Sequence, residues 1–173
     1  MKLADNYVLI GHMGAGKTTV GKQLASKCGK QFADTDAMIV EREKMSINDI
    51  FAKYGESHFR TIETNLLKEI TDSMSGYVIS CGGGLPLKEE NRAYLKRLGK
   101  VIYLKADESD IIKRLKNDNT RPLLKGPKDE VRAKVHGMLE IRNPIYEEAA
   151  DSVIVTSYKK ISEIVAEIIK DEE

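Results

Sequence analysis

The sequence predicts an α/β fold in which a parallel β-sheet is covered by helices on both faces. Five short apolar segments alternate with segments of helical periodicity along the 173 residues. Strands separated by helices are typical of parallel sheets, because parallel strands need a crossover connection. A glycine-rich loop between the first apolar segment and the first helix is a third indication of this fold class. At this length we expect a single domain, residues 1–173.

The glycine-rich loop covers residues 11–18, GHMGAGKT, and matches the phosphate-loop pattern G-x-x-x-x-G-K-[ST] without a mismatch. Its glycines let the backbone turn sharply and point N–H groups at an anion near a helix N-terminus. Lys17 can reach the β- and γ-phosphates of a nucleotide, and the Thr18 hydroxyl suits Mg²⁺. A plain glycine-rich turn is the weaker alternative, so the loop predicts binding of a nucleoside triphosphate. The expected contacts are Gly14, Ala15, Gly16, Lys17, Thr18 and Thr19.

The composition excludes several other classes of protein. Lys and Arg number 28 and Asp and Glu 27, so there is no overall basic charge for nucleic acid or an anionic membrane. Cys28 and Cys81 lack metal-ligand spacing, and we expect buried, reduced thiols. The N-terminus shows no signal-peptide pattern, and no segment reaches the about 20 apolar residues of a membrane span. We therefore expect a cytoplasmic protein.

Each element has its own local signal. We expect strands at 7–10, 31–35, 77–81, 101–104 and 153–155, and helices at 18–28, 37–44, 46–53, 56–74, 88–98, 109–115, 129–142 and 161–169. Gly29 and Gly55 end two of these helices, and Ser46 offers a capping box. Residues 116–128 are polar and contain prolines and Gly126, which predicts a mobile loop. Pro144 is expected to disturb the helix that precedes it.

Ligands of parallel sheets bind at the carboxyl ends of the strands, and two groups of residues follow strands here. In the DTD sequence at 34–36, one carboxylate could help to hold Mg²⁺ while the other accepts or orients a substrate hydroxyl proton. The alternative is that Asp36 is a helix N-cap. Residues 82–84, GGG, would let the backbone approach a ligand closely, or they form a strained turn. The strand before them carries no Asp, which favours Asp34 as the metal-side acid.

Three arginines are candidates for anion binding. Arg60 borders the buried stripe of its helix, beside Phe59. Arg142 continues an apolar stripe, and an inward-pointing arginine needs an anionic partner. That partner is either a substrate or an internal carboxylate such as Glu63. Arg121 lies in the polar loop, where it is either an arginine finger for phosphate or a solvated loop charge.

Together, six sequence motifs resemble the shikimate kinase family. They are GHMGAGKTT at 11–19, DTD at 34–36, FRTIE at 59–63, CGGG at 81–84, TRPLL at 120–124 and RNPIYEEAA at 142–150. The resemblance implies a three-layer phosphate-loop fold with strand order 2-3-1-4-5, a substrate-binding region at about 36–63 and a closing lid at about 116–128. It also implies transfer of the γ-phosphoryl group of ATP to the 3-hydroxyl of shikimate, giving shikimate 3-phosphate.

The resemblance further implies a role for each candidate residue. Asp36 would hold the hydroxyl and act as base, while Lys17 and Arg121 would stabilise the transferring phosphoryl group. Thr18 would hold Mg²⁺ with support from Asp34, and Arg114 would stack on adenine. The substrate side would be formed by Arg60 and Arg142 as carboxylate grips, Glu63 as their support, Gly82, Gly83 and Gly84 against the substrate, and Ile47, Phe51 and Phe59 as an apolar wall. The stretch near Ser157 lacks the proline expected in the adenine loop.

Two other functions are alternatives. A related small-molecule kinase, such as a gluconate kinase, is disfavoured by Arg60 and Arg142 together with DTD. A non-catalytic ATP-binding module or regulatory switch would not need a phosphate loop, an acid, a lid arginine and substrate arginines together. No exposed apolar seam is evident, so we expect a monomer.

Overall fold

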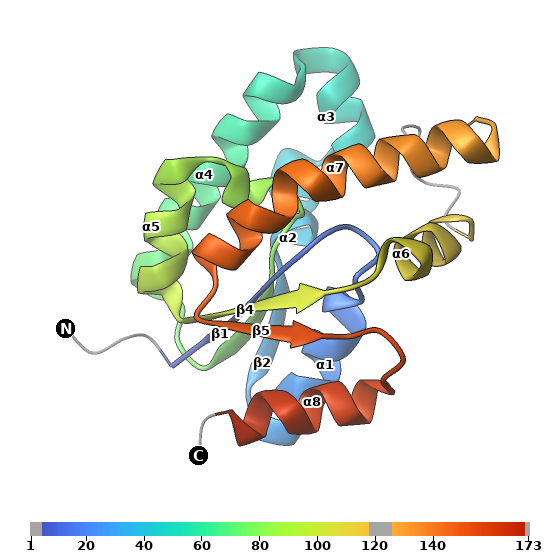
Figure 1. The fold of residues 1–173 in the computed structure, drawn as a ribbon. Coiled ribbons are helices and arrows are strands. Elements are labelled where there is room, and N and C mark those ends of the chain that lie inside the picture. Colours follow the sequence, from blue (N-terminus) through green and yellow to red (C-terminus); the bar gives the residue numbers. More distant parts are fainter. Residues whose placement is uncertain (1–4, 118–125, 172–173) are drawn as a thin grey trace.

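The computed structural model describes residues 5–117 and 126–171, and their central feature is a five-stranded parallel sheet (Figure 1). The order β2-β3-β1-β4-β5 is the one that the sequence motifs imply. The strands are β1 (Tyr7–Ile10), β2 (Gln31–Asp34), β3 (Tyr77–Ser80), β4 (Lys100–Lys105) and β5 (Ser152–Val155). The predicted fold class is therefore confirmed.

Helices occupy both faces of this sheet. They are α1 (Lys17–Cys28), α2 (Thr35–Glu43), α3 (Ile47–Tyr54), α4 (Glu56–Ser73), α5 (Glu89–Leu98), α6 (Glu108–Leu115), α7 (Lys128–Ala149) and α8 (Ile161–Lys170), with a short 3₁₀ turn, η1 (Leu85–Leu87). The expected caps form: the Gly29 backbone is left-handed, and the Ser46 hydroxyl accepts a hydrogen bond from the N–H of Asp49 at 3.1 Å. None of the helices in the described residues has the length and apolarity to cross a membrane.

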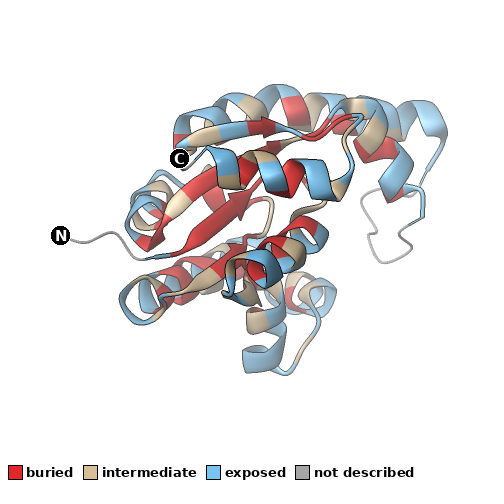
Figure 2. Ribbon diagram, turned by 90° about the horizontal axis from the view of Figure 1, so that it is seen from below, coloured by how far each residue is buried: buried red, intermediate tan, exposed pale blue. Residues whose placement is uncertain are grey.

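Alternate side chains of β1 enter two separate cores, as expected for a sheet covered on both faces. Val8 and Ile10 pack with residues of α4, α5 and α7, whereas Tyr7 and Leu9 pack with residues of α1 and α8. Figure 2 shows the buried residues concentrated along the strands and the inner faces of the helices. This packing makes the sheet a rigid support for the loops that leave it.

The strand register brings three of these loops together. Ser80 is level with Leu9 of β1 and with Asp34 of β2. Because all three strands run in the same direction, the segments that follow them leave the sheet at the same edge. The phosphate loop, the start of α2 and the glycine turn at residues 82–84 therefore lie close to one another.

The prediction that Pro144 disturbs the helix after Arg142 is wrong. Helix α7 runs through Pro144 to Ala149 and crosses the molecule above β4 and β5 (Figure 1). The proline removes only the hydrogen bond to the carbonyl of Glu140, which is exposed and can bind water instead. Beyond the proline, Tyr146 and Ala149 are buried in the core, and burying an aromatic side chain offsets part of that loss.

The polar loop predicted at 116–128 is described only at its two ends. Helix α6 ends at Leu115, and α7 begins at Lys128. Residues 118–125, and with them Arg121 and most of the proposed lid, lie outside the described residues.

Candidate active site

The phosphate loop joins β1 to α1, and its backbone needs glycine at three positions. Gly11, Gly14 and Gly16 have φ angles of 149°, 79° and 89°, which residues with a side chain rarely adopt. A Cβ atom on Gly11 would also lie 2.7 Å from the carbonyl oxygen of Leu104. Gly16 caps α1 without a side-chain acceptor, and the first turn of α1 carries no acidic residue. The N–H groups at this helix end therefore remain available for an anion.

Lys17 lies back across this loop. Its ammonium group donates to the carbonyl oxygens of Gly11 at 2.7 Å and His12 at 3.0 Å. These acceptors hold the charge at the mouth of the loop, and a phosphate could replace them as partners of the same group. Arg114 of α6 also reaches the loop and donates to the carbonyl oxygen of Gly14 at 2.9 Å. Two cations thus contact the loop that is expected to hold the phosphates.

Asp34 and Asp36 both reach the site, but from different elements than the sequence predicted. Strand β2 ends at Asp34, which is the N-cap of α2, because its Oδ1 accepts from the N–H of Ala37 at 3.0 Å. The N-cap alternative was therefore assigned to the wrong aspartate. Asp36 lies in the first turn of α2, not on the strand, yet both carboxylates line the same cavity.

Asp34 and Thr18 form the part of the site that suits a metal ion. The Thr18 hydroxyl lies 3.4 Å from the second carboxylate oxygen of Asp34. Hydroxyl and carboxylate oxygens are ligands that Mg²⁺ accepts, and Mg²⁺ at such sites usually keeps several waters and binds few protein groups. The described residues contain no cluster of three or more His, Cys, Asp or Glu that could hold a metal. The Thr18 hydroxyl and the Asp34 carboxylate together fit an Mg²⁺ that is bound mainly by nucleotide phosphates and water.

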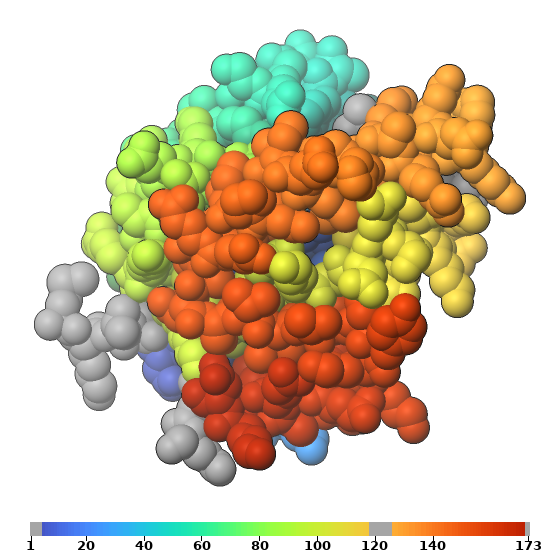
Figure 3. All heavy atoms as spheres, viewed as in Figure 1, coloured from blue at the N-terminus to red at the C-terminus, as the bar shows by residue number. Residues whose placement is uncertain are grey.

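A cavity of about 250 Å³ connects these groups. It lies where the ends of β1, β2 and β3 meet, so it has the phosphate loop on one side and the glycine turn on the other. Its lining consists of Met13, Gly14, Gly16, Lys17, Thr18, Thr19, Asp34, Asp36, Ser80, Cys81, Gly82 and Gly83. In the space-filling view, dark blue atoms of the N-terminal part of the chain are visible in a hollow between α7 and α6 (Figure 3).

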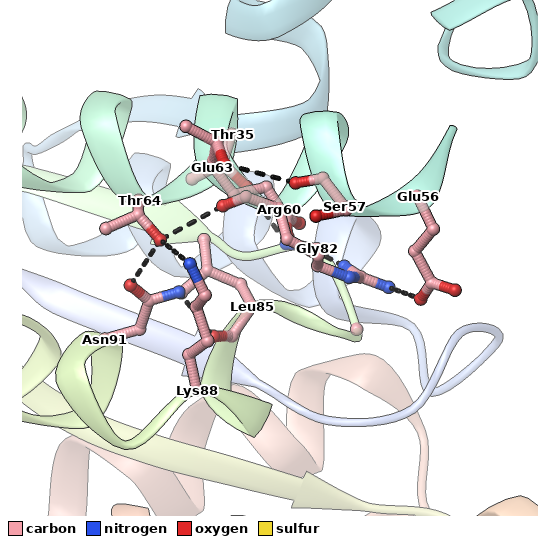
Figure 4. Close-up of polar contacts among 12 residues, drawn as sticks. Thr35, Glu56, Ser57, Arg60, Glu63, Thr64, Gly82, Leu85, Lys88 and Asn91 are labelled. Carbon is pink, nitrogen blue, oxygen red and sulfur yellow. Dashed lines mark hydrogen bonds and ion pairs between the residues drawn. The ribbon is translucent and has the colours of Figure 1, made fainter. Parts of the chain in front are cut away.

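Arg60 and Glu63, one turn apart on α4, form the acidic and basic wall beside this cavity (Figure 4). Arg60 donates to Glu63 at 2.7 Å and to Glu56 at 3.2 Å. Burial lowers the pKa of the Arg60 guanidinium, but the neighbouring glutamates outweigh this and raise it. Gly84 lies directly against the guanidinium, and a Cβ atom there would overlap it. The third glycine of the turn therefore makes room for Arg60.

The pKa of Glu63 is strongly shifted from its usual value. Its side chain is only 1% exposed, and burial raises its pKa to about 7, although Arg60 lowers it and Asp36 raises it further. Its Oε2 is paired with Arg60, whereas Oε1 has no hydrogen-bond partner among the described residues. A Cβ atom on Gly82 would lie 3.1 Å from this Oε1 and 2.7 Å from Oδ1 of Asp36. The first glycine of the turn thus lets two carboxyl groups approach the backbone together.

Arg142 does not take the internal partner that was considered for it. Within the described residues it forms no ion pair, with Glu63 or with any other carboxylate, although its charge lowers the pKa of Glu63. Its guanidinium lies beside the glycine turn, 3.7 Å from where a Cβ atom of Gly83 would be. A half-buried arginine at a cavity without an ion-pair partner favours an anionic ligand.

The apolar residues expected beneath the substrate pack together. The rings of Phe51 and Phe59 are 4.9 Å apart between centroids, and Phe59 is buried. The Arg60 guanidinium lies 5.4 Å from the Phe59 ring, and Phe51 and Ile47 pack against the same core. This wall is thus continuous with the hydrophobic core, and α3 holds it in place.

Several residues that position the site were not identified from the sequence. Thr35 accepts from the N–H of Gly82 at 2.9 Å, and Tyr146 donates to the carbonyl oxygen of Gly83 at 2.6 Å. A buried pair, Thr64 and Asn91, links α4 to the residue after the turn, because the Asn91 amide donates to the carbonyl of Leu85 at 2.9 Å (Figure 4). Thr35 and Tyr146 lie inside recognised motifs, but the other two have no sequence signal.

Comparisons with known proteins agree with this geometry. The family model described as shikimate kinase matches residues 13–173. A shikimate kinase of Thermodesulfovibrio yellowstonii is 44% identical over 168 residues, which are 97% of this chain and 95% of the relative.

Solved structures give the same result. The structure of shikimate kinase from Acinetobacter baumannii in complex with shikimate superposes with a TM-score of 0.90 at 37% identity, covering 99% of this chain and 93% of that one. Shikimate kinase from Bacteroides thetaiotaomicron gives a TM-score of 0.89 at 32% identity, covering 96% and 97%. The phosphate loop and the carboxylate pair line one cavity, Arg60 and Arg142 lie beside its glycine turn, and these relatives match nearly the whole length, so the chain belongs to the shikimate kinase family of ATP-dependent kinases.

Proposed function

We propose that this protein transfers the γ-phosphoryl group of ATP to the 3-hydroxyl of shikimate, giving shikimate 3-phosphate and ADP. The observation that carries the proposal is the convergence of two kinds of group on one cavity. Lys17 and the phosphate loop suit a nucleotide triphosphate, while Asp36 and the glycine turn, with Arg60 beside it, suit a small hydroxylated anion. Shikimate has both a carboxylate and ring hydroxyls, and a relative of the same fold is described in complex with it.

The nucleotide half of the site acts mainly through charge. On binding, the Lys17 ammonium would exchange the carbonyl oxygens of Gly11 and His12 for phosphate oxygens, and the N–H groups of the loop would hold the β-phosphate. Thr18 and Asp34 would hold Mg²⁺, which neutralises phosphate charge when it is bound. We also propose that Arg114 contacts the nucleotide and that Arg121 meets the phosphates from the lid.

The substrate half acts by orientation. Arg60 and Arg142 would bind the carboxylate of shikimate, Glu63 would fix the direction of Arg60, and residues 82–84 would lie against the ring. Asp36 would accept the proton of the 3-hydroxyl of shikimate as the hydroxyl oxygen bonds to the γ-phosphorus. The bond between the γ-phosphorus and the β,γ-bridging oxygen then breaks, and ADP leaves. Holding both reactants in line supplies much of the catalysis in such a transfer.

An acceptor-comparison assay tests the proposal. ADP release with shikimate and with gluconate is measured by a coupled assay, and phosphorus-coupled NMR of the product identifies the phosphorylated oxygen. We expect turnover with shikimate and a product phosphorylated at the 3-position. Equal or better turnover of gluconate would identify a different kinase, and ATP binding without transfer to any hydroxyl would identify a non-catalytic module.

We also propose that the protein is a monomer, that residues 1–173 form one kinase domain, and that it acts in the cytoplasm. Cys28 and Cys81 both remain thiols, which suits a reducing compartment. Light scattering coupled to size-exclusion chromatography gives the mass in solution, and a mass of 38 to 39 kDa, twice the 19.4 kDa of the chain, would contradict the monomer.

A further inference from the structure

We propose that Tyr146 is a positioning residue for the acceptor substrate, because its hydroxyl holds the glycine turn and the Arg142-bearing helix as one wall of the cavity. The inference deepens the proposed function and rests on it. Within the described residues the hydroxyl of Tyr146 donates to the carbonyl of Gly83, so it would act through Gly83 and Arg142 and not on the reacting atoms.

The hydroxyl of Tyr146 makes a short hydrogen bond inside the protein. The side chain is fully buried, and its oxygen lies 2.6 Å from the carbonyl oxygen of Gly83, to which it donates. Hydroxyl donors to carbonyls usually lie at about 2.7–2.8 Å, so this bond is at the short end. Loss of the hydroxyl would take from the half-buried Gly83 carbonyl the side-chain donor that holds it.

Gly83 lies in the cavity between the phosphate loop and Arg142. It lines the cavity, and a Cβ atom on it would lie 3.5 Å from the N–H nitrogen of Met13 and 3.7 Å from the guanidinium of Arg142. In a trans peptide the C=O and the next N–H point in opposite directions. Turning the Gly83 carbonyl toward Tyr146 therefore turns the N–H of Gly84 away from α7.

The glycine turn is held from two opposite elements. Thr35, at the start of α2, accepts from the N–H of Gly82 at 2.9 Å, and Tyr146 of α7 donates to the carbonyl of Gly83 at 2.6 Å. Three successive glycines have no side chains to restrict their backbone. These two side chains therefore supply the restriction that the sequence of the turn lacks.

Tyr146 also acts on Arg142, which lies one helical turn before it. Both residues lie on α7, and the charge of Arg142 lowers the pKa of the Tyr146 phenol, which burial raises. Pro144 lies between them and removes a helical hydrogen bond from the turn that carries Arg142. The hydrogen bond from Tyr146 to Gly83, beyond the proline, would hold this weakened turn in place, and Arg142 with it.

The chain offers a matched control for this hydroxyl. Tyr103 packs on Tyr146 with ring centroids 5.1 Å apart, is equally buried, and donates its hydroxyl to Asn143 of the same helix at 2.7 Å. Tyr103→Phe therefore removes a buried hydroxyl and a tether of α7 without touching Gly83. Tyr146→Phe removes a hydroxyl of the same kind that does touch it.

The experiment compares the two variants with the unmodified protein by steady-state kinetics, calorimetric titration of shikimate and thermal unfolding. For Tyr146→Phe we expect KM and Kd for shikimate to rise about tenfold while KM for ATP changes less than about twofold. For Tyr103→Phe we expect a similar loss of thermal stability with KM for shikimate within about twofold. Equal effects of both variants, or none, would overturn the positioning role.

Two further arms keep the result decisive. If Tyr146→Phe does not fold, Thr35→Val releases the same turn from its other side. A selective rise in KM for shikimate in that variant supports the proposal, whereas an unchanged KM overturns it.

The unmodified protein is assayed first. If it turns over shikimate while both tyrosine variants behave alike, only the positioning role fails; if it does not turn over shikimate, the proposed function fails.

Discussion

Replacing Glu63 with Gln should remove a pH-dependent part of the stability of this protein. Glu63 is buried, and its pKa rises from the usual 4.5 to about 7 because burial outweighs the attraction of Arg60. The folded protein therefore binds a proton at this carboxyl more tightly than the unfolded chain does. Stability then falls as the pH rises from the unfolded pKa through the folded one, since the folded state has the higher pKa.

The size of the effect follows from these two pKa values. For one carboxyl with such a shift, linkage gives a loss of about 2.5 kcal/mol in the free energy of unfolding between pH 5 and pH 8. Glutamine has almost the shape of a protonated glutamate and can still accept a hydrogen bond from Arg60, but it does not titrate. We therefore expect Glu63→Gln to have little effect at pH 5 and to be more stable than the unmodified protein at pH 8.

Urea unfolding at several pH values between 5 and 8 measures this difference. Taking the variant minus the unmodified protein cancels the other groups that titrate in this range, among them His136, whose pKa is raised by the hydrogen bond and charge of Glu108. A difference in unfolding free energy that stays constant from pH 5 to pH 8 would refute the reasoning. It would mean that Glu63 is ionised throughout, with Arg60 fully compensating for its burial.

Three further predictions concern the proposed reaction. Asp36→Asn should lower kcat by about 10²- to 10⁴-fold with nearly unchanged ATP binding, since it removes the proposed proton acceptor, and an unaltered kcat would exclude that role. Gly84→Ala should raise KM for shikimate about tenfold by displacing Arg60, whereas Gly137→Ala, whose added methyl group meets nothing within 4 Å, should not change it. The Kd for shikimate, measured by calorimetry, should increase above pH 7 as Glu63 ionises, and Glu63→Gln should flatten that dependence.

The parts of the fold that the sequence predicted are those with a local cause. The phosphate loop needs glycine at backbone angles that other residues avoid, and β1 is a continuous apolar run because it is buried on both faces. The strand ends then bring the phosphate loop, the DTD aspartates and the glycine turn together, since a parallel sheet leaves these segments at one edge. For the same reason Asp34 and Asp36 were found as a pair although the boundary between β2 and α2 was misplaced.

The parts that could not be predicted depend on contacts between distant segments. Local rules end a helix at Pro144, but the burial of Tyr146 beyond it is a tertiary effect with no local sign. The Thr64–Asn91 pair joins residues 27 positions apart, and neither residue type implies the other. The partner of Glu63 is a different case: Arg60 lies three residues before it on the same helix and is a local candidate, whereas only the packing of α7 decides whether Arg142 comes within reach.

The raised pKa of Glu63 affects the net charge beside the cavity. Arg60 and Arg142 face Asp36, Glu56 and Glu63, so with Glu63 ionised these carboxylates outnumber the two arginines and would oppose an incoming carboxylate. A proton on Glu63 removes one of these negative charges, beside the arginine that a substrate carboxylate would contact. Because burial holds the pKa near neutrality, an arriving anion that competes for Arg60 weakens the interaction keeping Glu63 ionised and so favours that proton. We therefore expect Glu63 to orient Arg60 when the site is empty and to take up a proton when an anion occupies the site.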